Sequence, residues 1–295
     1  MRDVHHYSCY GLGIESEIVL PLPPLQAASS LPLVEVLVGG PEAPAEPALP
    51  YDVGGVAFGP CSGGVVVHMP GLPAFFVSES CIRIWDLEAA EEVGDIVVRM
   101  IFLFVFQLRS MLTFHGSAAS RNGRAIALFG NCGAGKSTTA MGLAKRGWGF
   151  LSDDIVLVDT EGTIPQGATR ARLNSDSFDR LVDCPLSSTP RDRDGKYIVE
   201  HRVVGSSARL GCVVVLEAAA VDAVEGHEIH GYTKLHMALP HMHSFPGIGN
   251  PGSRLRKVAE ILACVPLFVI QRPRGRFAID ELLDTIETLS LREDS

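Results

Sequence analysis

The chain has 295 residues, of which 46% are hydrophobic and 20% charged, a composition typical of a globular protein with one large domain or two modest ones. Its formal net charge of −9 disfavours a nucleic-acid-binding role, because a phosphate backbone requires a basic surface. The seven cysteines are scattered and form no C-x-x-C pair, which favours reduced thiols over a disulfide framework or a zinc knuckle.

The N-terminal segment gives no targeting signal. Met1 to His6 lack the apolar core of a signal peptide, and the most apolar stretch, residues 96–108, is short and contains Arg99. We therefore expect a soluble, cytoplasmic protein without a membrane partner.

Residues 1–87 predict a small β-rich N-terminal domain. Short apolar runs at 33–38, 64–69 and 74–77 are typical of strands, and proline-rich stretches around them indicate loops. A connecting helix is predicted over 88–112, since acidic residues precede an apolar second half. A membrane-seeking helix is the alternative for this stretch. The remaining residues, 113–295, form the second predicted domain.

A hairpin is predicted where the second domain begins. Asn122-Gly123 separates two strand-like runs, which is a strong signal for a two-residue turn. The first run carries His115, and the second, residues 124–129, leads into a glycine-rich loop. His115 is therefore either structural or near whatever that loop binds.

The glycine-rich loop matches the phosphate-binding pattern G-x-x-x-x-G-K-[ST] in full. A strand-type run precedes it, and a helical pattern that ends at Gly147 follows it. Backbone N–H groups, the helix N-terminus and the Lys136 ammonium would meet a polyphosphate there, and Ser137 would ligate Mg²⁺. The predicted nucleotide-binding residues are Gly130, Asn131, Cys132, Gly133, Ala134, Gly135, Lys136, Ser137 and Thr138.

Two adjacent carboxylates, Asp153 and Asp154, begin seventeen residues after Lys136 and open a second apolar run. An ordinary P-loop NTPase places its magnesium aspartate at the end of such a run. Two neighbouring carboxylates near a bound Mg²⁺ can divide the work, with one on the metal and one accepting a proton from an attacking hydroxyl. A solvated turn before a strand is the alternative.

Two later segments keep open interpretations. The charged residues 187–196 form either a lid or a solvated surface loop. Residues 227–243 hold five of the ten histidines and are interpreted as a zinc site, a substrate-facing segment or plain surface. An amphipathic helix is predicted over 277–291.

Together these residues resemble the HPr kinase/phosphorylase family. The resemblance depends on His115-Gly116, the octet with Lys136-Ser137, the helix end at Lys145-Arg146-Gly147, and Asp153-Asp154. It implies an α/β P-loop kinase domain whose nucleotide site is similar to that of phosphoenolpyruvate carboxykinase, with ATP and Mg²⁺ as cofactors. It further implies Asp153 as the general base, Asp154 and Ser137 on the metal, and His115 and Lys136 at the transferring phosphate.

The chain departs from bifunctional members of that family. Their downstream Arg-Gly-Leu-Gly signature is absent from residues 201–212, so phosphorylase activity is not expected. The stretch from Tyr10 to Pro23 resembles smaller HPr-kinase-like proteins that tailor peptide natural products, including lasso peptides. The resemblance implies an ATP-dependent serine kinase acting on a precursor peptide. An HPr-type protein kinase, a small-metabolite kinase and a nucleotide-binding sensor without turnover are the alternatives.

Overall fold

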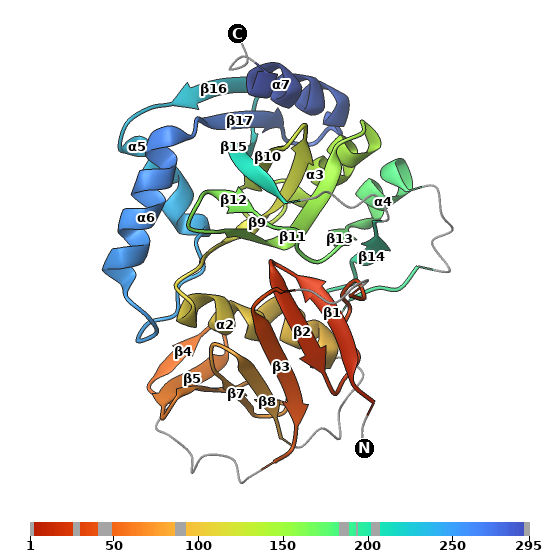
Figure 1. Ribbon diagram of the computed structural model, residues 1–295. Coiled ribbons are helices and arrows are strands. Elements are labelled where there is room, and N and C mark those ends of the chain that lie inside the picture. Colours follow the sequence, from red (N-terminus) through yellow and green to blue (C-terminus); the bar gives the residue numbers. More distant parts are fainter. Residues whose placement is uncertain are drawn as a thin grey trace. The chain divides into compact units, whose positions relative to one another are not determined.

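The computed structural model describes residues 3–25, 30–40, 49–85, 93–182, 189–192, 194–201 and 207–291 of the chain. It divides into two compact units (Figure 1), Met1–Thr113 with His243–Arg254, and Phe114–Met242 with Leu255–Ser295. Both units combine helices with sheets, so the protein is of the mixed α/β class.

An eight-stranded sheet dominates the first unit. Its strands are β1 (His5–Cys9), β2 (Leu12–Ser16), β3 (Leu33–Val38), β4 (Tyr51–Val53), β5 (Val56–Cys61), β6 (Gly64–His68), β7 (Phe75–Val77) and β8 (Cys81–Ile84). They lie in the order β1-β2-β3-β8-β7-β6-β5-β4. In β3, Val34 and Val36 are buried while Leu33 and Glu35 are exposed, as the twofold alternation of a strand requires. The three runs predicted as strands correspond to β3, β6 and β7.

The apolar helix of the first unit is shorter and less regular than the sequence predicts. It consists of α1 (Val93–Ile96), a π-helical turn (Val97–Ile101) and α2 (Phe102–Leu108). Residues 88–92 lie outside the described residues. The chain turns at Ser110, which has a φ of 57°, and the next strand begins at Leu112.

Aromatic packing ties this helix into the core of the first unit. The Phe104 ring stacks on Phe245 at 4.1 Å between centroids and meets Phe58 edge-on at 5.3 Å. The Gln107 amide donates to the carbonyl oxygens of Phe245 and Ile248 at 2.6 and 2.8 Å. The returning segment 243–254 is therefore fixed to the helix by both apolar and polar contacts.

The second unit is built on a seven-stranded sheet. Its strands are β9 (Leu112–Arg121), β10 (Arg124–Phe129), β11 (Gly149–Val158), β12 (Thr163–Ile164), β15 (Ala208–Ala219), β16 (Glu225–Ile229) and β17 (Leu267–Pro273). The order is β11-β9-β10-β15-β17-β16, with β12 paired to β15. The pairs β10–β15 and β15–β17 are parallel, and β9 and β16 are antiparallel to β10 and β17. Asn122 and Gly123 form the predicted turn between β9 and β10, both with positive φ.

Helices and a small hairpin complete the second unit (Figure 1). The helices are α3 (Lys136–Lys145), α4 (Ser175–Leu181), α5 (Thr233–Ala238), a 3-10 turn (Leu239–His241), α6 (Pro251–Cys264) and α7 (Ile279–Leu291); β13 (Arg170–Leu173) pairs with β14 (Tyr197–Glu200). Helix α3 ends at Lys145, and Gly147, the residue predicted to stop it, has a φ of 87°; the Trp148 N–H donates to the Leu143 carbonyl at 3.1 Å. Helix α7 packs on α3 over the sheet.

Among the described residues, no helix has the length and apolar character needed to span a membrane. Cys184 and residues 202–206, within the stretch 201–212 that lacks the Arg-Gly-Leu-Gly signature, fall outside the described part of the chain.

Candidate functional site

The glycine-rich octet connects the end of β10 to the start of α3. Its glycines Gly130, Gly133 and Gly135 all have positive φ. At Gly130 a Cβ atom would lie 2.5 Å from the Leu216 carbonyl oxygen of β15, so only glycine fits where the loop leaves the sheet. Gly135 is the N-cap of α3, which places the N-terminus of a ten-residue helix at the loop.

Lys136 is folded back into the loop. Its Nζ donates to the carbonyl oxygens of Gly130 at 2.8 Å and Asn131 at 3.2 Å, and the residue is only 7% exposed. Burial lowers the pKa of the Lys136 ammonium, and the charges of Asp153 and Asp154 act in the opposite direction. The ammonium is thus held at the centre of the loop in an environment that favours an added negative charge.

Asp153 lies directly beneath the loop serine. One carboxylate oxygen, Oδ1, accepts from Ser137 Oγ at 2.8 Å and from Ser117 Oγ at 2.7 Å. The other, Oδ2, accepts from the backbone N–H of Arg172 at 2.9 Å. The Asp153 side chain is therefore buried and engaged by three donors from α3, β9 and β13.

Asp154 has different surroundings. Its φ of 75° is unusual for a non-glycine residue inside a strand and changes the direction of the side chain relative to a regular strand. Asp154 Oδ1 lies 3.3 Å from His115 Nδ1, and Oδ2 lies 3.4 Å from Nη1 of Arg172. About a quarter of the side chain is exposed, so a ligand can reach it.

The sequence interpretation placed this acidic pair before an apolar strand. In the structure both residues lie in the middle of β11, and Asp153 is 5% exposed. The apolar run fails to show this because the strand begins earlier, at Gly149, and the aspartates are stabilised by partners on neighbouring elements. A solvated turn at Asp153-Asp154 is thereby excluded.

Arg172 joins Asp153 and Asp154 to Asp192, which lies in the charged segment 187–196 that the sequence predicts as a lid or a solvated surface loop. Its Nε lies 3.2 Å from Asp192 Oδ2, and both side chains are almost fully buried. Asp192 Oδ1 in turn accepts from the backbone N–H groups of Asp194 and Lys196. The turn around Asp192 is thus anchored to the site through Arg172.

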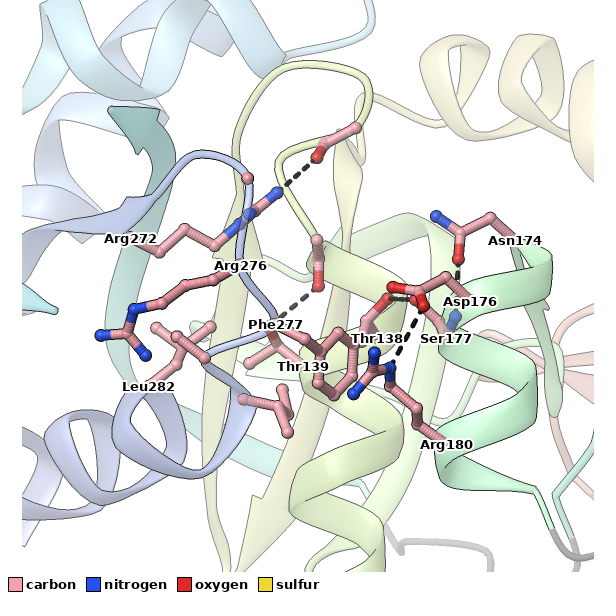
Figure 2. A pocket seen from close by; sticks show the side chains of 15 residues that line it. Thr138, Thr139, Asn174, Asp176, Ser177, Arg180, Arg272, Arg276, Phe277 and Leu282 are labelled. Atoms are coloured by element: carbon pink, nitrogen blue, oxygen red, sulfur yellow. Dashed lines mark hydrogen bonds and ion pairs between the residues drawn. The ribbon is translucent and has the colours of Figure 1, made fainter. Parts of the chain in front are cut away.

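A pocket of about 420 Å³ adjoins the outer side of the loop (Figure 2). Thr138 and the loop glycines form one wall, and Arg180 of α4 faces Phe277 with its guanidinium 4.7 Å from the ring centroid. The Thr138 hydroxyl is 2.9 Å from Ser177 Oγ, which links α3 to α4 at the floor of the site. An aromatic ring, a guanidinium and several hydroxyls suit a ligand with a flat face and polar edges.

Arg272 holds the tip of the loop from β17. Its Nε donates to the Ala134 carbonyl at 2.7 Å and its Nη2 to the Gly133 carbonyl at 2.8 Å, a contact visible in Figure 2. These bonds fix the loop shape over a separation of more than a hundred residues along the chain.

The structure brings together most of the residues predicted for the site. His115, Lys136, Ser137, Asp153 and Asp154 are connected by the contacts above, whereas Asn131 and Cys132 are exposed at the loop tip. Ser117, Arg172 and Arg272 were missed. The strand period of two, which puts Ser117 on the same face as His115, could have identified Ser117; no local signal marks the two arginines.

The histidine-rich segment is divided among several elements. His227 lies on the exposed edge strand β16, His236 on α5 and His241 in the 3-10 turn. Among the described residues, no three His, Cys, Asp or Glu side chains are grouped closely enough to hold a metal ion. The donors at the loop, a serine hydroxyl and a carboxylate 2.8 Å apart, are hard oxygen ligands of the kind that Mg²⁺ binds together with substrate phosphates.

Comparison with known proteins finds little. No family model matches the chain, and no curated protein matches it. Among solved structures, the chain is similar to the Hpr(Ser) kinase/phosphatase from Coxiella burnetii, with 13% sequence identity, a TM-score of 0.31, and coverage of 61% of this chain and 97% of that chain. These values describe a distant likeness.

Proposed function

We propose that this protein is an ATP-dependent kinase that transfers the γ-phosphoryl group of ATP to a serine hydroxyl of a peptide. The observation that carries the proposal is the hydrogen bond between Ser137 and Asp153 beneath a glycine-rich loop. Phosphotransferases with such a loop use a hydroxyl and a carboxylate at these positions to hold Mg²⁺, and the loop backbone and its lysine to hold the phosphates.

Phosphate binding would use groups that are already in position. The N-terminus of α3 lies at the loop, and Lys136 would exchange its two carbonyl acceptors for phosphate oxygens. Ser137 and Asp153 would hold Mg²⁺, which supplies positive charge against the growing negative charge on the phosphate oxygens. Arg272 would keep the loop tip from opening.

Proton transfer would use the other carboxylate. Asp153 already accepts hydrogen bonds from three donors, while Asp154 is partly exposed and paired with His115. The contacts therefore favour Asp154 as the acceptor of the serine proton and Asp153 as the metal-side carboxylate, with His115 orienting Asp154. This division is opposite to the one that the sequence resemblance implies.

The pocket beside the loop would take the base and ribose of the nucleotide. It opens next to Thr138, the residue that follows the metal-side serine, so a base there would leave its phosphates within the loop. Phe277 and the Arg180 guanidinium offer flat surfaces for a purine.

The acceptor is proposed from the sequence resemblance, which favours a serine on a precursor peptide of the lasso type. An HPr-like protein, a small metabolite and a sensor role without turnover remain the competing functions.

The decisive experiment measures ADP release from purified protein with Mg-ATP, alone and with serine-containing peptides, HPr protein or a metabolite pool. A peptide kinase releases ADP and adds one phosphoryl group to the peptide, as seen by mass spectrometry. Serine-to-alanine peptides serve as controls. Binding of ATP without release of ADP under any condition would support the sensor function instead.

A further inference from the structure

His241 lies beside His115 on a neighbouring segment of the second unit. An antiparallel bridge joins Phe114 of β9 to Met242, so the adjoining positions on the two segments are His115 and His241. Directly opposed positions of an antiparallel pair place their side chains on the same face. The two histidines are thus neighbours although 126 residues separate them in the sequence.

Packing fixes the His241 ring at the base of the loop. Its centroid lies 5.8 Å from that of Phe129, the last residue of β10 and the one that precedes Gly130. Phe129 also stacks on Phe114 at 5.0 Å. Gly116 makes this packing possible, because a Cβ there would approach the Phe129 ring to 2.9 Å. The aromatic cluster therefore presents His241 at the point where the loop begins.

The electrostatic surroundings disfavour the charged form of His241. Burial lowers the pKa of His241, and the positive charges of Lys136 on α3 and His115 on β9 lower it further. A neutral imidazole can donate one N–H hydrogen bond without adding a charge to be desolvated. The bridge to β9 and the contact with Phe129 place the ring beside the strand that leads into the phosphate-binding loop.

We infer that His241 is a second catalytic histidine of the site, donating a hydrogen bond to a non-bridging oxygen of the transferring phosphoryl group. This role rests on the proposed kinase function and extends it, because His115 is engaged with Asp154 while His241 lies beside it where the loop begins. Such a donor stabilises charge that spreads over the phosphoryl oxygens as the bond to the leaving oxygen breaks.

Exposed histidines of the same segment provide matched controls. His227 is exposed on β16, and His236 is exposed on α5 with its ring edge against Tyr232. Neither interacts with Lys136 or His115 in the contacts described. If the loss of any histidine in this segment slowed the reaction, the His236 variant would be slowed as well.

The kinetic test compares His241→Ala, His241→Gln and His236→Gln in the full chain. We expect His241→Ala to lower kcat about 10- to 100-fold while KM for ATP stays within about threefold, as for loss of a transition-state donor. His241→Gln keeps an N–H donor and should recover part of kcat, and His236→Gln should match the wild type. Equal kcat for His241→Ala and wild type would overturn the inference.

A second measurement does not require turnover. Histidine Cε1–H resonances are titrated in the wild type with and without a non-hydrolysable ATP analogue and Mg²⁺, and the His241 signal is assigned by its absence in His241→Gln. Phosphate charge favours the imidazolium, so nucleotide should raise the His241 pKa by about one unit, and the His227 resonance should not respond to nucleotide. Calorimetry on the same sample reports nucleotide binding: binding without a response of His241 overturns this inference alone, and no binding overturns the proposed function with it.

Discussion

At the residue scale, two consecutive aspartates of one strand have unlike environments. Asp153 is buried and accepts hydrogen bonds from two hydroxyls and a backbone N–H, whereas Asp154 has a left-handed φ and an exposed edge beside His115. Aspartate tolerates this backbone conformation better than most residues. The positive φ of Asp154 therefore holds its carboxylate in a direction that a regular strand residue would not have.

Charge removal at the two positions should give different kinetic results. Asp154→Asn preserves shape and tolerates the positive φ, so we expect kcat to fall about 10²- to 10⁴-fold with Mg-ATP affinity within roughly tenfold. Asp153→Asn should chiefly raise the Mg²⁺ concentration needed for half-maximal activity. Steady-state kinetics over a magnesium series makes the comparison. The reverse pattern would assign the base to Asp153, as the sequence resemblance implies.

At the scale of elements, the glycine-rich loop depends on a strand far away in the sequence. Arg272 on β17 donates to two loop carbonyls, and its burial lowers the pKa of its guanidinium only from a very high value, so the charge persists. The loop conformation is thus set jointly by its own glycines and by β17.

Arg272→Ala should loosen the loop without removing a group that touches the reacting atoms. We expect KM for ATP to rise about tenfold, since the loop then pays an ordering cost on binding, with a smaller change in kcat. Arg274→Ala is the matched control, because Arg274 donates to the Ala218 carbonyl and not to the loop. An ATP titration by calorimetry distinguishes the two variants. Equal ATP affinities of the two variants would show that the hydrogen bonds from Arg272 to the loop do not contribute to nucleotide binding.

The turn around Asp192 is joined to β13, and through it to the site, by the buried ion pair of Arg172 and Asp192. Removing one partner leaves the other charge buried, so Arg172→Met should lower the free energy of unfolding by about 3–5 kcal/mol. The double variant Arg172→Met/Asp192→Asn should recover part of this loss. Urea denaturation of the three proteins gives the coupling between the two residues; fully additive losses would argue against the pair.

At the scale of the whole molecule, one residue of the binding site, Lys136, makes an unfavourable contribution to the free energy of folding. The ordinary pKa of Lys136 is lowered by burial, which means that folding disfavours its ammonium. This unfavourable contribution is present below the folded-state pKa and disappears as pH rises through that pKa toward the unfolded value. A bound ligand that supplies negative charge offsets this unfavourable contribution.

Replacement of Lys136 should affect the stability of the free protein and its binding of nucleotide in opposite directions. We expect Lys136→Met to unfold at a temperature equal to or above that of the wild type without nucleotide, and to lose the rise in Tm that Mg-ATP gives the wild type. Lys145→Met, at the other end of α3, should keep that rise. Thermal melts with and without Mg-ATP provide the measurement; a nucleotide-dependent rise in Lys136→Met would place the phosphates elsewhere.

The sequence by itself determined the features that depend on neighbours along the chain. The turn at Asn122-Gly123, the loop from Gly130 to Ser137 and the helix end at Gly147 all follow from backbone preferences and short-range hydrogen bonds. Strands such as β3 and β6 were predictable because their apolar pattern has the period or continuity of a buried strand.

Only the tertiary structure decided which side chains meet. Asp153 and Asp154 are equivalent in the sequence, and their partners Ser117, Arg172 and His115 come from β9 and β13. Arg272 and His241 reach the loop from more than a hundred residues away and carry no local pattern. Such contacts depend on strand order and register, which bring distant segments to one end of the sheet, and a periodicity within one segment contains no information about them.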